Sequence, residues 1–144
     1  MTNREEQLNH ALEAMHFGFR AMTLRPDQRL AELGLSRIHH RLLYFIGRNS
    51  KCSINELLKI MGITKQYLHR PLKTLIECGY ILQTVDSQDR RIKRLRHSPE
   101  GEKLEFALSE VQRRRFEEIF EQVGPGVERH WRQVMDLLGN RIEF

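Results

Sequence analysis

Two short helical stretches, joined by a glycine turn and followed at once by an alternating basic segment, constrain the fold of this chain most strongly. Ser53 and Glu56 stand three residues apart, as in a capping box, and begin the first stretch, which Gly62 ends. Thr64 can cap the second stretch, which runs to Gly79. Two short helices joined by such a turn are typical of a helix-turn-helix.

The segment after this unit predicts a β-hairpin, because apolar and polar residues alternate on both sides of a polar tip. The first strand is expected over residues 80–85, the tip over 86–91 and the second strand over 92–97. A helix-turn-helix followed directly by a basic hairpin is a winged helix. The second helix of such a unit is shaped to enter a DNA major groove roughly 12 Å wide.

Amphipathic helices are expected on both sides of this unit. An apolar stripe predicts a helix over residues 4–24, and Pro26 is expected to block its continuation. Ser36 can cap the next helix, and Ser98 can cap a long one with Pro99 at its first position.

A last helix is expected after the Gly-Pro-Gly break at residues 124–126. The predicted fold class is mainly α with a small β-hairpin, an α+β winged helix within a single domain's length. Residues 35–98 would form the winged helix-turn-helix DNA-binding region. Residues 1–34 and 99–144 would form a helical dimerisation region.

Positive charge is concentrated in one quarter of the chain. The whole chain carries a net charge of +5. The segment from Thr64 to His97 holds eight basic and three acidic residues, a surplus of five, so the remaining residues sum to neutral. A localised surplus indicates a polyanionic partner, and double-stranded DNA suits a winged helix.

One face of the helix after the glycine turn carries only polar and charged residues. We expect base contacts from Gln66, His69 and Arg70, because glutamine can pair bidentately with adenine and arginine with guanine. Phosphate contacts are expected from the N-terminus of the helix and its lysines, namely Thr64, Lys65 and Lys73.

The run over residues 85–91, at the tip of the hairpin, contains Asp89-x-Arg91, and Gly101 follows ten residues after the arginine. With this motif, the tip of the hairpin and the helix after it resemble the MarR family of winged helix-turn-helix transcriptional regulators. The resemblance implies that Asp89 holds the wing by pairing with a neighbouring arginine and that Arg91 enters the minor groove. Arg90 and Lys93 are further candidates for DNA contacts. The chain departs from the family pattern at His97, where leucine is usual.

The apolar stripes of the terminal helices need a partner, because a chain of this length cannot bury them alone. We therefore expect a homodimer on a pseudo-palindromic operator with half-sites roughly one helical turn apart. Its function would be sequence-specific transcriptional regulation, with repression favoured. The residues expected at the dimer interface are Leu8, Leu12, Met15, Phe19, Trp131, Val134 and Leu138.

The resemblance also implies a small aromatic effector, held between the dimerisation helices and the winged region, that loosens the grip on DNA. The effector-binding residues are not fixed by the sequence, and a core or surface role is the alternative for each candidate. The candidates are His16, Phe17, Phe19, His39, His40 and Arg41.

Other classes of function are disfavoured. No catalytic motif is recognisable, so the chain is not expected to be an enzyme and no cofactor is expected. The adjacent His39 and His40 would diverge on a helix, so no metal site is expected. Cys52 and Cys78 would be small part-buried thiols, with redox sensing as the alternative.

Two further expectations complete the sequence analysis. No apolar run is long enough for a membrane span and the N-terminus is polar, so a cytoplasmic protein without a membrane partner is expected. The alternative function is a winged-helix module for protein–protein assembly that does not bind DNA. Such a module would need neither the localised charge nor the arginines at the hairpin tip.

Overall fold

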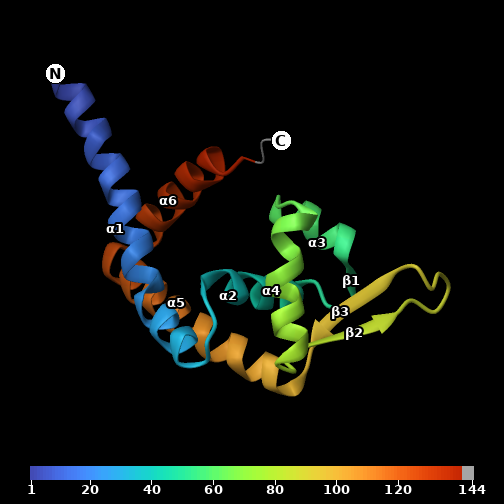
Figure 1. The fold of residues 1–144 in the computed structure, drawn as a ribbon. Coiled ribbons are helices and arrows are strands. Elements are labelled where there is room, and N and C mark those ends of the chain that lie inside the picture. Colours follow the sequence, from blue (N-terminus) through green and yellow to red (C-terminus); the bar gives the residue numbers. More distant parts are fainter. Residues whose placement is uncertain (141–144) are drawn as a thin grey trace.

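Over residues 1–140, which the computed structural model describes, the chain forms six helices and a three-stranded antiparallel sheet (Figure 1). The helices are α1 (Asn3–Glu32), α2 (Arg37–Arg48), α3 (Ile54–Met61), α4 (Lys65–Glu77), α5 (Pro99–Val123) and α6 (Pro125–Leu138). The strands are β1 (Cys52–Ser53), β2 (Ile81–Val85) and β3 (Lys93–His97). The predicted fold class, mainly helical with a winged helix, is confirmed.

The expectation that Pro26 ends the first helix is wrong. Helix α1 continues through Pro26, which is buried, and ends at Glu32. A proline leaves the carbonyl one turn earlier without its backbone donor. Here that carbonyl, on Met22, accepts a hydrogen bond from Nε2 of Gln112 at 3.0 Å. A side chain from distant α5 thus replaces the missing donor and lets the helix continue.

The predicted caps of the helix-turn-helix are confirmed. Ser53 Oγ accepts from the Glu56 backbone N–H, and the Glu56 carboxylate accepts from the Ser53 N–H. Gly62 ends α3 in the left-handed region at φ +65°, where a side chain would be strained. Thr64 then caps α4 by accepting from the Tyr67 N–H.

The sheet has one strand more than the hairpin that the sequence predicts. In the order β1-β3-β2, β3 lies in the centre, with Leu95 opposite both Cys52 and Gln83. A two-residue strand such as β1 has no alternation to recognise. Its pairing with Arg94 and Leu95 ties the middle of β3 to the start of α3.

The core lies where α2, α3, α4, the sheet and the first half of α5 meet. Leucine and isoleucine side chains dominate it: Leu30, Leu42, Leu43, Ile46, Leu57, Leu68, Leu75, Ile81, Leu95 and Leu108 are fully buried or nearly so. Gly101 is required at the entry to α5, because any Cβ there would overlap the carbonyl oxygen of Tyr80. This close approach gives a physical reason for the glycine noted in the sequence.

His97, where the family pattern usually has leucine, is accommodated by two features of α2. Its Nε2 donates to the Leu43 carbonyl at 2.6 Å, and its ring lies against Gly47, whose missing side chain leaves the space. The end of β3 therefore packs on α2 through a hydrogen-bonded ring.

Two terminal arms leave this core. Helix α1 has no buried residue before Thr23, and α6 has none at all. Both rise from the same side of the body, whereas the β2–β3 hairpin extends in another direction, and the long α5 joins the two regions (Figure 1). None of the helices within residues 1–140 is long and apolar enough to cross a membrane.

Candidate nucleic-acid interface

Helix α4 separates its apolar and polar faces cleanly. Leu68, Leu72 and Leu75 are buried against the core. The residues predicted to contact DNA from this element are all exposed: Thr64, Lys65, Gln66, His69, Arg70 and Lys73. The helix continues through Pro71, so this face is unbroken over its length.

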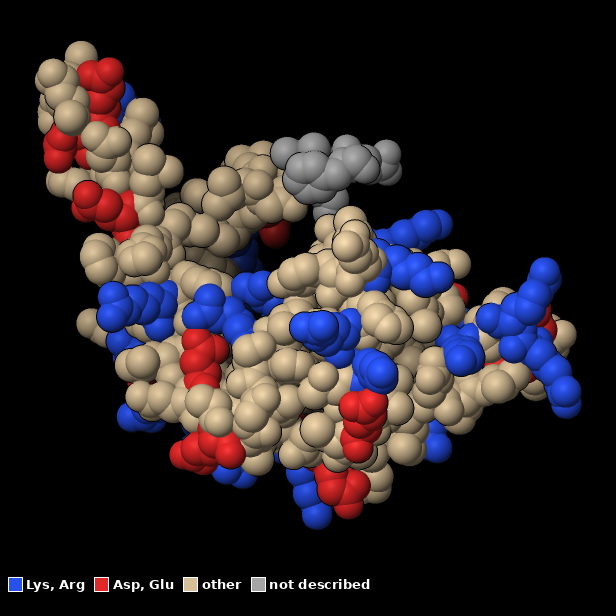
Figure 2. All heavy atoms as spheres, in the orientation of Figure 1, with Lys and Arg blue, Asp and Glu red and all other residues tan. Residues whose placement is uncertain are grey.

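The charges on this face are largely available to a ligand. Lys73 lies 3.9 Å from Glu77 with both side chains well exposed, a contact that contributes little in water. Within residues 1–140, neither Lys65 nor Arg70 forms an ion pair. Figure 2 shows basic residues along α4 and at the tip of the hairpin, and acidic residues at the far end of α1.

Asp89 and Arg91 form the pair at the hairpin tip that the family resemblance implies. The Asp89 carboxylate accepts from the Arg91 backbone N–H at 3.0 Å and from its Nε and Nη2 at 3.2 Å each. The guanidinium lowers the pKa of Asp89, and the backbone N–H adds to this effect. The Arg91 side chain is nevertheless 91% exposed, so it stays accessible while its orientation is restrained. Its contact with DNA remains a prediction.

A second ionic cluster, which the sequence analysis missed, ties the tip end of the hairpin to α3. Arg94 Nε donates to Asp86 at 3.1 Å, and its Nη1 donates to Glu56 of α3 at 3.1 Å. Asp86 also accepts from the backbone N–H groups of Gln88 and Asp89. We call Asp86, Arg94 and Glu56 the hairpin clamp. The sequence held one signal for this cluster. Asp86 opens a polar turn, and an aspartate in that position commonly accepts hydrogen bonds from the next backbone N–H groups.

The clamp residues carry shifted pKa values. Backbone N–H groups, and then Arg94, lower the pKa of Asp86. The Ser53 N–H, and then Arg94, lower the pKa of Glu56, while both carboxylates raise the pKa of Arg94. All three groups are therefore held in their charged forms.

The positive surplus of the sequence is divided between two surfaces. Arg94 is neutralised within the clamp, and Arg96 lines a separate groove beside α5. The remaining predicted wing residues are accessible, since Arg90 and Lys93 are exposed and Asp89 is half-buried. Part of the surplus that the sequence concentrates in this segment therefore does not face the proposed DNA-binding surface.

A small pocket of about 220 Å³ lies between α1, α2 and α5. Phe19, His40 and Arg41 from the predicted effector set line it, whereas His16, Phe17 and His39 do not. Arg37 also lines the pocket, stacks over the Phe19 ring at 4.7 Å and pairs with Asp27 at 2.6 Å. No sequence pattern pointed to this last pair, because the partners come from different helices.

Cysteine redox chemistry receives little support. Cys52 is buried, and burial raises the pKa of its thiol, which disfavours the reactive thiolate. Cys78 is exposed.

Residues 1–140 contain no group of three or more potential metal ligands placed to hold an ion.

The side chains predicted at the dimer interface are exposed in the single chain. On α1 these are Leu8, Leu12, Met15 and Phe19, and on α6 they are Trp131, Val134 and Leu138. Trp131 also packs on Phe116 and Phe120 of α5, with ring centroids 5.2 and 5.4 Å apart.

The fold and the polar face of α4 define a winged helix-turn-helix protein, and comparisons with known proteins agree. The family model described as MarR family matches residues 33–92. The HTH-type transcriptional regulator PetP of Rhodobacter capsulatus is 37% identical over 134 residues, which cover 93% of this chain and 81% of that protein. The chain belongs to the MarR family of transcriptional regulators. This membership also confirms the prediction that the chain is not an enzyme.

Solved structures with low sequence identity share the fold. A MarR protein from Peptoclostridium difficile matches with a TM-score of 0.77 at 20% identity, covering 92% of this chain and 87% of the other. The Staphylococcus aureus MepR–DNA complex matches with a TM-score of 0.71 at 18% identity, covering 90% and 96%. The overall fold is therefore the one that these structures share.

Proposed function

We propose that this protein is a homodimeric transcriptional repressor that binds a pseudo-palindromic duplex site in the cytoplasm. The observation that carries the proposal is the exposed, polar and cationic face of α4 beside a hairpin whose tip presents Arg90 and Arg91. A helix of this kind fits the major groove, and a basic hairpin reaches the neighbouring backbone or minor groove. The structural similarity to a MepR–DNA complex supports the same assignment.

Within this proposal the residues divide by task. Gln66, His69 and Arg70 read base edges, because their side chains offer donors and acceptors along the exposed face of α4. Thr64, Lys65 and Lys73 meet phosphates, which set the position of the helix without reading sequence. Asp89 restrains Arg91, which enters the minor groove beside Arg90 and Lys93.

The terminal arms supply the dimer. Residues 1–34 and 99–144 form the dimerisation region and residues 35–98 the DNA-binding region, with residues 141–144 lying outside the described part of the chain. Exposed apolar side chains on both arms support this division, because a single copy leaves them in water. Two copies related by a two-fold axis would present two α4 helices to two half-sites.

A small aromatic acid is the proposed effector, and the pocket between α1, α2 and α5 is its proposed site. The Phe19 ring, with guanidinium groups of Arg37 and Arg41 near its face, offers both stacking and charge. The volume of about 220 Å³ suits a single-ring compound.

A duplex-binding titration over a range of salt concentrations tests the proposed DNA contacts. Arg91→Ala should weaken binding to all sequences and lower the salt slope by about 0.9, because one phosphate-region contact is lost. Arg70→Ala should also relax preference at one base position, by about 1–3 kcal/mol. Sites selected from a random duplex pool would supply the sequences for both measurements.

Arg25→Ala is the matched control, since Arg25 is exposed on α1 and forms no ion pair within residues 1–140. It should bind like the parent protein. Parent-like binding by Arg70→Ala and Arg91→Ala together would contradict the proposal. A dimer that binds no duplex at any salt concentration would instead favour a module for protein assembly.

A further inference from the structure

Helix α1 changes from an exposed arm to a part of the body over a weakened stretch, residues 19–26, which we call the arm root. Thr23 is the first buried residue of α1. Its hydroxyl donates to the Phe19 carbonyl at 2.9 Å, a kind of contact that commonly bends helices. Pro26 leaves the Met22 carbonyl without its backbone donor. The arm root is therefore the place at which α1 bends most easily.

The body holds α1 firmly on the C-terminal side of the arm root. Asp27 pairs with Arg37 of α2 at 2.6 Å, and Leu30 is fully buried in the core. The Arg37 guanidinium also donates to the Thr23 hydroxyl oxygen at 3.3 Å. The end of α1 is therefore fixed to the body, whereas no residue before Thr23 is buried.

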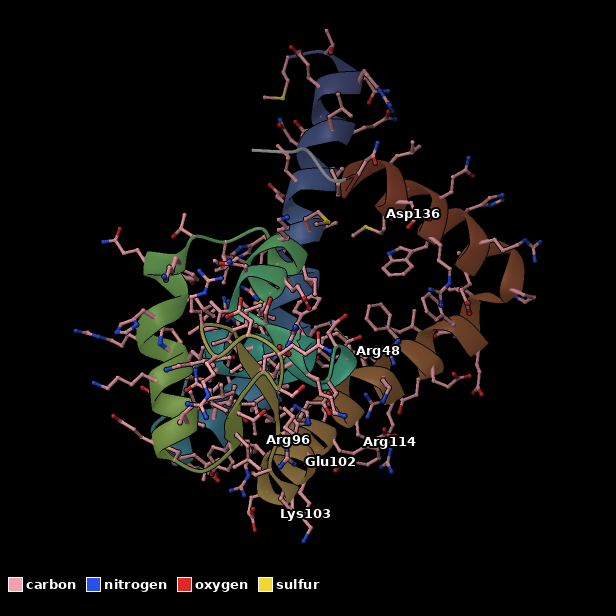
Figure 3. The ribbon with its side chains drawn as sticks, turned by 90° about the vertical axis from the view of Figure 1, so that its right-hand side faces the viewer. Arg48, Arg96, Glu102, Lys103, Arg114 and Asp136 are labelled. Carbon is pink, nitrogen blue, oxygen red and sulfur yellow. The ribbon has the colours of Figure 1, made fainter. Side chains whose placement is uncertain are left out.

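One side chain from α5 supplies the donor that the proline lacks. Gln112, which is half-buried, donates through Nε2 to the Met22 carbonyl at 3.0 Å. Helix α5 leads on into the second arm, α6, and Figure 3 marks Arg114 on the first of these helices and Asp136 on the second. The hydrogen bond thus joins the root of one arm to the helix that carries the other.

A small bend at the arm root would have a large effect at the end of the arm. From Asn3 to Met22 the arm is about 30 Å long, at 1.5 Å per residue. A bend of about 10° would move its far end by about 5 Å, and sharp kinks of more than about 20° occur mainly at proline. One base pair rises about 3.4 Å along a duplex. Because the arms join the two copies in the proposed dimer, such bends would change the separation of the two α4 helices by a distance comparable with one base-pair step.

We propose that Gln112 is a positioning residue, whose hydrogen bond to Met22 sets the direction of the α1 arm and thereby the half-site spacing that the dimer accepts. Gln112 does this without touching DNA, since it lies between α1 and α5. The effect on spacing rests on the proposed function as a DNA-binding dimer. The effect on the direction of the arm does not, because the hydrogen bond lies within one chain.

Duplexes with the half-sites at the preferred spacing, and with one base pair added or removed, test the effect on DNA. The parent should lose at least about tenfold in affinity when the spacing changes, because the spacing must match the separation of the recognition helices. Gln112→Met keeps the length of the side chain but has no donor. It should lose only about two- to threefold, because its arms no longer hold one separation.

A second substitution separates positioning from packing. Pro26→Ala restores a backbone N–H donor for the Met22 carbonyl, so its combination with Gln112→Met should regain the parent's preference for one spacing. Pro26 is fully buried, so a role in packing alone would make the double variant worse than Gln112→Met. Gln122→Met is the matched control and should keep the parent's preference, because Gln122 is exposed on the same helix.

A distance measurement without DNA tests the arm itself. One spin label is placed on the native Cys78, which is exposed at the end of α4, and the other on Glu13→Cys, at an exposed position of α1. Mixing with excess unlabelled chain restricts the signal to distances within one chain. The distances should be narrowly distributed in the parent and in Gln122→Met, more widely in Gln112→Met, and narrowly again in the double variant.

The two measurements fail in different ways. Unchanged distances in Gln112→Met, or a wider distribution that Pro26→Ala does not reverse, would overturn the proposal. A wider distribution with an unchanged preference for half-site spacing would overturn the part that concerns DNA. A parent that binds no duplex would contradict the proposed function instead, and the distances would still confirm or overturn the role of Gln112 in directing the arm.

Discussion

The winged body and the terminal arms of this protein differ in how much of their apolar surface is buried. The body, from Thr23 to about Ser109, buries leucines and isoleucines from helices, sheet and α5 in one core. The arms, the first half of α1 and all of α6, contain no fully buried residue, although they carry apolar stripes. A helix that buries so little of its surface is marginally stable in water. The difference teaches that the body is held by its own contacts, whereas the arms bury too little surface in one copy, which is why we propose that a second copy covers them.

The largest expected effect is in the body. Leu43→Ala should lower the free energy of unfolding by about 2–5 kcal/mol, because it leaves a cavity at a fully buried site. Leu137→Ala, on α6 with a 72% exposed side chain, should leave the unfolding of the body nearly unchanged. Chemical denaturation followed by circular dichroism measures both. Equal losses would remove the distinction between body and arms.

A charge on the apolar stripe of α1 tests the arms next. Leu12→Asp should weaken dimerisation by about 2 kcal/mol or more, as for a disrupted interface centre, and analytical ultracentrifugation would measure it. Phe17→Asp is the matched control, since Phe17 is also exposed on α1 but faces away from the stripe. A parent chain that sediments as a monomer, or equal effects of both variants, would argue against the stripe as the interface.

The hairpin clamp differs from the rest of the body, because it holds the hairpin by ion pairs rather than by apolar packing. Arg94→Met removes both contacts to Asp86 and Glu56 while keeping a long side chain. Hydrogen exchange of the hairpin-tip amides should accelerate by about two- to fivefold, the range for ion pairs near the surface. Arg96→Met, on the same strand but outside the clamp, should leave this exchange unchanged.

The smallest expected effect is on the pH dependence of stability, and it involves His40, at the contact between α2 and α5. Ser109 donates to Glu105, so the neutral His40 ring donates through Nε2 to Ser109 Oγ at 3.0 Å. Burial lowers the pKa of His40 below its ordinary 6.5, although the charges of Glu105 and Asp27 oppose this and Arg41 adds to it.

Because the unfolded chain takes up this proton first, the stabilisation is complete above pH 6.5. It is lost as the pH falls from 6.5 toward the lower folded pKa. The melting temperature should therefore fall on mild acidification, and less so in His40→Gln, which keeps a donor for Ser109. Some dependence should remain, since burial lowers the pKa of His39 too. Identical pH profiles for the two proteins would exclude a role for His40.

The sequence by itself determined the elements whose signals are local. The capping pair Ser53 and Glu56, the polar face of α4 and the alternation of the hairpin each follow from residues within a few positions of one another. The exposed residues predicted on α4 are therefore the same ones that the structure exposes. The apolar stripes of the arms were also visible, because helical periodicity does not depend on the partner that covers them.

Only the tertiary structure decided what depends on residues distant in sequence. Pro26 stays helical because Gln112 supplies the donor that the backbone lacks. Arg94 is a clamp because α3 brings Glu56 to it, and Arg96 faces a groove because α2 and α5 meet there. The sequence fixes how many charges a segment carries. Which of them remain free is set by neighbours that only folding brings within the few ångströms over which a hydrogen bond or ion pair acts.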